Sequence, residues 1–381
     1  FIAFLFLVLV NIDFDGKKEI MVVKMRVFMI RKNVRFWESL GQIGNFPQTI
    51  IIALFLLILY LVGCGKPTKS ESEKVDFSEK IKHYEELAYK FAPIYVQAFK
   101  SKYDIPTNFD FDGDFIGNNN WENAEKFEFS PYAYWDVKES ENFLFFYYAL
   151  FYPRDYLEDC ENPPHVENCH ENDWEQMLVV VKKPEMKTIL FETLPHVFDI
   201  VYLKDYSADL VVSGVLMKGK NPHFVDQRPV IFIEWGGHGQ YGSPEDIAEK
   251  EFFSFESTKV LVPEKFDFDL KSDSVLKYKL IYIYDVFWPR KDDVGEGKTF
   301  DNYFEFEVEG IHFKLPKNFD GDVPEKGKFV KDAASAPWYA HSVPGEEGIW
   351  FVHPVEILKR RGIISSGSQE KYLFNPYIDV K

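Results

Sequence analysis

The spacing of apolar residues predicts one helix, followed by many short strands. Apolar positions recur at helical spacing over residues 79–100, and Asp76 and Ser78 are residue types that cap helix N-termini. Pro93 predicts a kink or an end of this helix. Beyond residue 100, aromatic and β-branched runs alternate with Gly, Pro, Asn and Asp, as in strands joined by turns. The predicted strands are residues 133–137, 143–152, 177–182, 197–202, 210–216, 229–235, 277–284 and 304–308.

This pattern favours a mainly β fold over an alternating α/β fold. We expect a two-sheet antiparallel β-sandwich with long loops and an N-terminal helix. Phenylalanine, with 38 of the 381 residues, is the expected main core filler. The length of the chain after residue 63 suffices for one large β-domain or two small ones, and the sequence has no internal repeat at a solenoid period. We expect a single domain over residues 76–381.

The segment before that domain predicts export and attachment to a membrane. Residues 50–62 form an uninterrupted apolar run, which is too short to span a bilayer and typical of a signal-peptide core. The run ends in Leu61-Val62-Gly63-Cys64, which resembles the bacterial lipobox, whose cysteine carries the lipid. We therefore expect removal of residues 1–63, a lipid on Cys64, a flexible tether over residues 64–75 and a location in the bacterial cell envelope. The alternative is an ordinary anchor helix with an incidental cysteine.

Charge and cysteine content narrow the partners and the compartment. The chain has 44 basic and 61 acidic residues, a net charge of −17, which repels nucleic acids and attracts divalent cations. No pattern indicates a protein partner. After Cys64 only Cys160 and Cys169 remain, and this even count in an oxidising compartment predicts a disulfide between them. Such a bridge would hold Asp155 near His170, whereas a thiolate metal site would match no common zinc spacing.

An acidic cluster with one histidine lies where two predicted strands meet a loop. Asp155 follows the strand at 143–152, and His170, Asp173 and Glu175 precede the strand at 177–182. Side chains two residues apart in a strand share a face, so Asp173 and Glu175 point together. Oxygen donors with one imidazole suit calcium, magnesium or manganese better than a structural zinc. The four residues therefore predict a divalent-cation site, and the alternative is a solvated strand start beside a loop histidine.

The same segment resembles the necrosis-inducing-protein-like (Nep-like) cytolysins, whose signature is Gly-His-Arg-His-Asp-Trp-Glu after an aromatic-Pro-Lys-Asp turn. The matching sequences here are Cys169-His170-Glu171-Asn172-Asp173-Trp174-Glu175 and Tyr152-Pro153-Arg154-Asp155. The segment also resembles the vacuolar-protein-sorting sixty-two family through His-x-x-Asp-Trp-Glu. Both families place a histidine turn after a later strand, which Gly236-Gly237-His238-Gly239-Gln240-Tyr241-Gly242 matches. The resemblance implies a shared fold, cation ligands at Asp155, His170, Asp173 and Glu175, and cation-assisted recognition of glycosylated membrane lipids.

Three functions are consistent with these features. The first is a protein that uses a bound cation to engage a polyol, a glycan or a phosphorylated lipid headgroup, with His238 and Tyr241 as ligand contacts and Glu234 steering His238. The second is a metal-dependent hydrolase of phosphoester or glycosidic bonds, with His238, Glu175 or Glu234 as acid or base. The third is a structural envelope lipoprotein whose ion holds loops together. The other histidines, His196 among them, are interpreted as surface or satisfied residues.

Overall fold

The computed structural model describes residues 3–14, 17–28, 71–156, 169–196, 198–204, 210, 215–248, 252–267, 274–321, 334–339 and 343–378. The chain divides into two compact units, Phe1–Val75 and Asp76–Lys381. In the first unit, β1 (Ala3–Phe14) pairs antiparallel with β2 (Lys17–Phe28). None of the helices in the described ranges is long and apolar enough to cross a membrane. The apolar run at 50–62 and Cys64 lie outside these ranges, so the signal peptide and the lipid attachment remain predictions.

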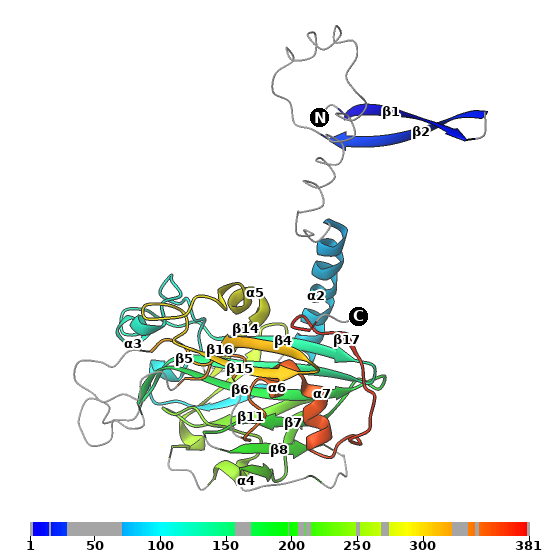
Figure 1. Ribbon diagram of the computed structural model, residues 1–381. Coiled ribbons are helices and arrows are strands. Elements are labelled where there is room, and N and C mark those ends of the chain that lie inside the picture. The colour runs from blue at the N-terminus through cyan, green and yellow to red at the C-terminus, as the bar shows by residue number, and fades with distance from the viewer. Residues whose placement is uncertain are drawn as a thin grey trace. The chain divides into compact units, whose positions relative to one another are not determined.

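One large curled sheet organises the second unit (Figure 1). Its hydrogen-bonded order is β10-β11-β3-β13-β14-β4-β5-β6-β7-β8-β9, with β12 beside β11 and β17 beside β4. A separate two-stranded sheet joins β15 and β16. The strands of this unit are β3 (Ile94–Ala98), β4 (Tyr132–Ser140), β5 (Phe143–Asp155), β6 (His170–Lys182), β7 (Lys187–Thr193), β8 (Asp199–Leu203), β9 (Leu216–Lys218), β10 (His223–Val225), β11 (Arg228–Ile233), β12 (Gln240–Tyr241), β13 (Thr258–Pro263), β14 (Val275–Tyr282), β15 (Tyr303–Val308), β16 (Ile311–Pro316) and β17 (Tyr372–Phe374).

The mainly β prediction is confirmed, but the sheet is mixed rather than antiparallel. Strand β3 runs parallel to β11, and β14 runs parallel to both β13 and β4. Strands β4 to β8 form the antiparallel centre. The prediction of purely antiparallel pairing was therefore wrong, because alternation of apolar residues does not encode the direction in which distant strands pair. The predicted two-sheet sandwich is not confirmed.

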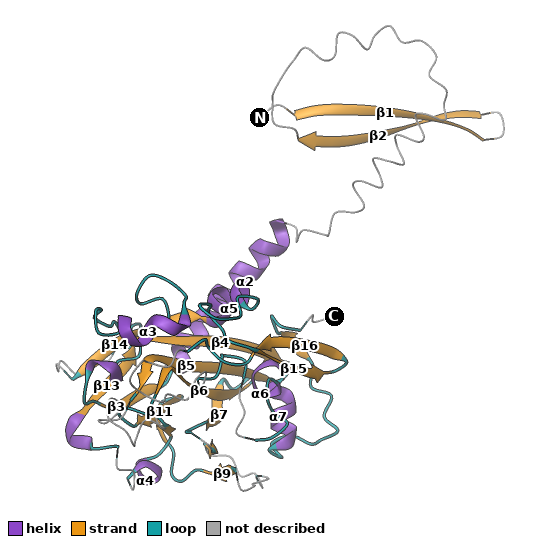
Figure 2. Cartoon of the chain, turned by 60° about the vertical axis from the view of Figure 1, so that its left-hand side comes forward, coloured by secondary structure: helices purple, strands orange, loops and turns teal. Residues whose placement is uncertain are grey.

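Helices lie around this body of strands (Figure 2). The predicted helix is α2 (Glu71–Phe91), which ends before Pro93, and residues that were predicted to extend it form β3 instead. Proline lacks the N–H that an interior helical position needs, so the helix stops there. The short helices are α3 (Asn120–Asn123), α4 (Pro244–Ile247), α5 (Ile283–Phe287), α6 (Ile349–Val352) and α7 (Pro354–Arg360).

Strand β5 separates two hydrophobic cores and is buried on both faces. Phe145 and Tyr147 pack into one core together with Trp350 of α6. Phe146 and Tyr148 pack into the other, which also contains the inner residues of α2. Burial on both sides explains why this strand is continuously apolar instead of alternating. The polar residues at the end of β5 and the start of β6 follow directly on this rigid centre.

Candidate metal centre

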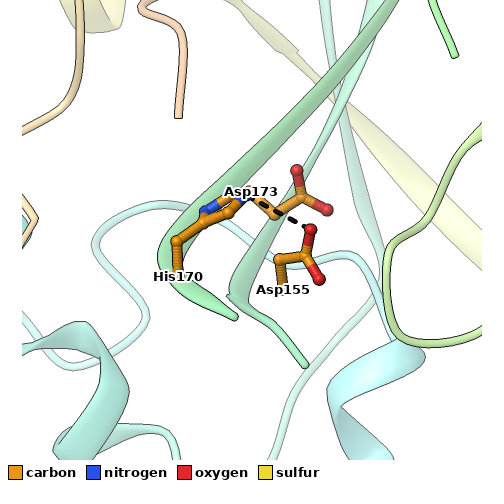
Figure 3. A group of neighbouring side chains, drawn as sticks. All are labelled: Asp155, His170 and Asp173. Carbon is orange, nitrogen blue, oxygen red and sulfur yellow. Dashed lines mark ion pairs between the residues drawn. The ribbon is translucent and has the colours of Figure 1, made fainter. Parts of the chain in front are cut away.

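Three of the four predicted ligands meet at the ends of two neighbouring strands. Strands β5 and β6 are antiparallel, with Asp155 opposite His170 and Tyr152 opposite Asp173. His170 Nε2 lies 3.2 Å from Asp155 Oδ2. One ligand atom from each of Asp155, His170 and Asp173 lies within 4.8 Å of the other two (Figure 3). Because β6 starts at His170, these ligands stand on a strand and not on the loop before it.

Glu175, the fourth predicted ligand, lies two residues after Asp173 on the same strand and is buried. Within the described part of the chain, its Oε2 atom has no hydrogen-bond partner. Burial raises the pKa of Glu175 well above its usual value, and the charges of Asp173, Asp155 and Glu234 raise it further. A buried carboxylate oxygen without a donor is costly, and a nearby cation would compensate it. The donor set therefore fits a hard divalent cation.

Protonation of His170 balances part of this negative charge. Burial disfavours its imidazolium, but the charge and hydrogen bond of Asp155 outweigh that effect and raise the pKa of His170 to about 9. Burial also raises the pKa of Asp155, while His170 acts in the opposite direction. Because a metal ion binds neutral imidazole, a cation and this proton would compete for His170.

His238 is fully buried and holds Asp173 in place. Its Nδ1 lies 2.7 Å from Asp173 Oδ2, and its Nε2 lies 3.3 Å from Asp104 Oδ1. The ring stacks on Tyr152, with centroids 3.6 Å apart. Burial disfavours the charged ring, but the two carboxylates raise the pKa of His238 to about 9. Since both nitrogens and one ring face are engaged, this geometry favours a positioning role for His238 over direct contact with a ligand.

Asp104 belongs to the site although nothing in the sequence pointed to it. It ends the short helix η1 (Lys102–Asp104) and accepts hydrogen bonds from the backbone N–H groups of Lys100, Ser101 and Gly236, at 2.8 to 2.9 Å. Burial acts to raise its pKa, but His238 and the backbone N–H groups of Ser101 and Lys100 prevail and lower it. Asp104 is therefore a fixed anion that orients His238.

His196 also lies at the site, where it pairs with Glu234. His196 Nε2 is 2.7 Å from Glu234 Oε2, and the side chain of His196 is 43% exposed. The hydrogen bond to Glu234 raises the pKa of His196, although burial opposes the shift. A Cβ atom on Gly237 would lie 3.2 Å from His196 Cε1 and 3.7 Å from Asp155 Oδ1, so His196 and the cluster border the same turn. The sequence interpretation of His196 as a surface or satisfied residue agrees with this exposure and pairing, but it did not place His196 at the site.

Two further sequence predictions are a ligand contact at Tyr241 and a disulfide between Cys160 and Cys169. Tyr241 is buried in β12, where burial and the charges of Glu234 and Glu175 raise the pKa of its phenol. Its predicted contact with a ligand remains a prediction. Cys169 is buried against Trp121 and Tyr156. Cys160 lies outside the described residues, so the Cys160–Cys169 disulfide also remains a prediction.

Comparisons with known proteins find partial structural likeness only. No family model and no curated protein matches the chain. Among solved structures, necrosis and ethylene inducing protein 2 from the causal agent of cocoa's witches' broom disease matches at 12% identity, covering 38% of this chain and 72% of its own, with a TM-score of 0.22. NLPPya in complex with glucosamine matches at 14% identity, covering 44% and 81%, with a TM-score of 0.23. The non-toxic HaNLP3 protein matches at 15% identity, covering 50% and 85%, with a TM-score of 0.21. Likeness at these TM-scores identifies neither the family nor the function of this chain.

Proposed function

We propose that this protein binds a divalent cation through Asp155, His170, Asp173 and Glu175 and uses the ion to recognise an oxygen-rich ligand. The observation that carries the proposal is the convergence of ligand atoms from the first three residues within 4.8 Å. The unpartnered oxygen of Glu175, among the described residues, supports the fourth position. Carboxylates with a single imidazole suit calcium, magnesium or manganese.

The charge of the surrounding site supports the same conclusion. When all of its carboxylates and imidazoles are charged, the carboxylates outnumber the imidazoles, and this excess of negative charge contributes to the raised pKa of Glu175. A divalent cation would balance that excess in a region where water is largely excluded. The groups concerned are the carboxylates of Asp104, Asp155, Asp173, Glu175 and Glu234 and the imidazoles of His170, His196 and His238.

The ligand class follows from the chemistry of the ion. Calcium accepts about six to eight oxygen ligands, so four protein side chains leave positions open. Vicinal hydroxyls of a polyol or glycan, or phosphate oxygens of a lipid headgroup, are donors that suit such positions. His196, partly exposed beside the cluster, could donate a hydrogen bond to the same ligand. From the sequence we further propose that a lipid on Cys64 keeps the protein at a membrane outside the cytoplasm.

One observation also favours a second function, metal-dependent hydrolysis of a phosphoester or glycosidic bond. His196 is oriented by the buried carboxylate of Glu234, which is the arrangement that activates a general base. A bound cation would supply a more acidic water molecule. In this alternative, His196 accepts a proton at the site and Glu234 stabilises the resulting imidazolium.

Calorimetric titration of the purified protein with Ca²⁺ and with Mg²⁺ tests the cation site. We expect binding that Asp173→Asn weakens at least about tenfold, because the variant removes a charged ligand of nearly the same shape. Asp292→Asn is the matched control, since the side chain of Asp292 is 77% exposed. Absence of binding by the unaltered protein, or equal affinity of both variants, would contradict the proposal.

Ligand recognition is tested separately with phosphatidylcholine vesicles that contain or lack phosphatidylinositol, whose headgroup carries both a phosphate and a polyol. We expect cosedimentation that requires phosphatidylinositol and Ca²⁺ and that EDTA abolishes. Hydrolysis of aryl phosphate or aryl glycoside substrates that is lost in His196→Gln would instead favour the second function. Cation binding without either activity would leave a structural ion.

A further inference from the structure

We propose that Asn172 is a positioning residue whose left-handed backbone turns His170 and Asp173 onto one face of β6. The proposal rests on the proposed function, because it concerns the geometry of the same cation site. It assigns a role to a residue that supplies no ligand atom and that lies between two residues that do.

The spacing of the ligands requires such a device. Side chains in a strand alternate between faces, so His170 and Asp173, three residues apart, should point in opposite directions. Yet ligand atoms of both residues lie within 4.8 Å of one another and of Asp155. The alternation must therefore change between them.

The contacts of the intervening residues locate the change. Glu171 Oε1 accepts a hydrogen bond from the backbone N–H of Trp121 at 2.6 Å. Asn172 Oδ1 accepts one from the side chain of Asn120, also at 2.6 Å. Two consecutive residues thus reach the same segment on one side of the strand, whereas Asp173 contacts His238 on the other side. The reversal lies at Asn172.

The backbone of Asn172 accounts for this reversal. Its φ angle is +57°, in the left-handed region, which asparagine adopts more readily than most residues. Strand pairing continues in the same register on both sides, with Arg154 opposite Glu171 and Tyr152 opposite Asp173. The residue opposite Asn172 is therefore Pro153, which has no N–H to donate to the ladder. Because Pro153 cannot donate to the ladder, Asn172 can leave the extended conformation without an inserted residue.

The side chain of Asn172 holds this conformation. It is fully buried, and its Nδ2 donates to the carbonyl oxygens of Gly117 and Asp320, each at 2.9 Å. With the bond from Asn120, the amide joins the two segments at 117–120 and 318–321 to the strand that carries the ligands. A buried amide with all these partners has one favourable orientation. Segments without any ligand atom therefore fix the geometry of the cation site.

Two substitutions separate the backbone effect from a general loss of stability. Asn172→Gly removes the amide but keeps a residue that adopts positive φ without strain, and Asn172→Ala removes both. We expect Asn172→Ala to weaken Ca²⁺ affinity in calorimetry at least about tenfold and Asn172→Gly to restore most of it. Asn221→Ala is the matched control, because Asn221 also has a positive φ, of 33°, and its amide bonds Glu245 away from β6.

Crystal structures of both Asn172 variants without added cation provide a readout independent of binding. We expect His170 and Asp173 to diverge in Asn172→Ala and to remain together in Asn172→Gly. A structure of Asn172→Ala with both side chains still on one face would overturn the inference. Failure of the unaltered protein to bind Ca²⁺ would instead refute the proposed function, while the two structures would still decide the role of Asn172.

Discussion

Replacing Arg361 with methionine should destabilise the fold far more than the same change at the adjacent Arg360. Arg361 is 2% exposed, and its guanidinium donates to Glu192 at 3.1 and 2.6 Å and to Glu346 at 2.8 and 2.7 Å. The indole N–H of Trp350 donates to the same Glu192 at 3.0 Å. This cluster joins the C-terminal helices α6 and α7 to β7.

The magnitude follows from what the substitution leaves behind. In Arg361→Met, the three buried carboxylates of Glu192, Glu346 and Asp199 lose the cation beside them. Removing one partner of a buried ion pair costs about 3–5 kcal/mol, so this variant should lose at least about 3 kcal/mol. Arg360 is 35% exposed and lies 3.5 Å from Glu356 and 3.8 Å from Glu346, but Glu346 keeps its bonds to Arg361 when Arg360 is replaced. Partly exposed pairs of this kind contribute about 1 kcal/mol or less.

Urea unfolding at neutral pH, followed by tryptophan fluorescence, measures the difference directly. The triple variant Glu192→Gln/Glu346→Gln/Arg361→Met removes the guanidinium together with the two carboxylates that it hydrogen-bonds, and leaves Asp199, 3.7 Å from the guanidinium, as the remaining buried charge. It should recover much of the loss. If Arg361→Met and Arg360→Met lost equal stability, to within about 0.5 kcal/mol, the guanidinium would not be compensating buried charge and the reasoning would be refuted.

Three further predictions concern a buried lysine, a close approach of the backbone and the orienting histidine. Burial lowers the pKa of Lys138 to about 8, although Asp136, 3.0 Å away, opposes the shift. In the unfolded chain the pKa of this lysine is about 10.5, so the unfolded chain keeps the proton to a higher pH. Between about pH 8 and pH 10, the free energy of unfolding of the unaltered protein should therefore rise relative to that of the double variant Asp136→Asn/Lys138→Met, by up to on the order of 3 kcal/mol. A difference between the two proteins that stays constant over this pH range would contradict the prediction. Gly117→Ala would place a Cβ atom 2.1 Å from the backbone oxygen of Asp320 and should lower the stability measured by thermal unfolding by about 1–3 kcal/mol. Gly367→Ala is the control and should be neutral, because a Cβ atom there would have no heavy atom within 4 Å. Equal losses in the two variants would refute the steric argument. His238→Asn should reduce Ca²⁺ affinity about 10- to 100-fold in calorimetry, because a ligand loses its orienting partner, and unchanged affinity would exclude that role.

The sequence was most informative where the site is local. Asp155, His170 and Asp173 lie on two adjoining strands, so strand periodicity and residue chemistry sufficed to group them. Asp104 and His196 come from η1 and from the turn after β7. Asp104 follows β3, whose partner strands are distant in the chain, and His196 is held by Glu234, which is 38 residues away. A single sequence contains no signal for either contact.

The arrangement of the sheet was less predictable for the same reason. Each strand's apolar pattern showed that it is buried, but not which strand it pairs with or in which direction. Asn172 shows a further limit, because it precedes the predicted strand at 177–182 and the structure places it inside β6. Its left-handed conformation depends on the partners supplied by Gly117 and Asp320, which only the folded chain brings together.

The place of β3 in the sheet has a consequence for the order of folding. This strand is the first of the body to be synthesised, yet both of its neighbours, β11 and β13, are synthesised after residue 227. Until those segments leave the ribosome, the apolar side chains of β3 have no sheet to join, and closure of such distant contacts is slow. A nascent chain that stalls before β11 would therefore expose the unpaired backbone and the apolar side chains of β3. We expect such a chain to aggregate more readily unless a chaperone covers this strand.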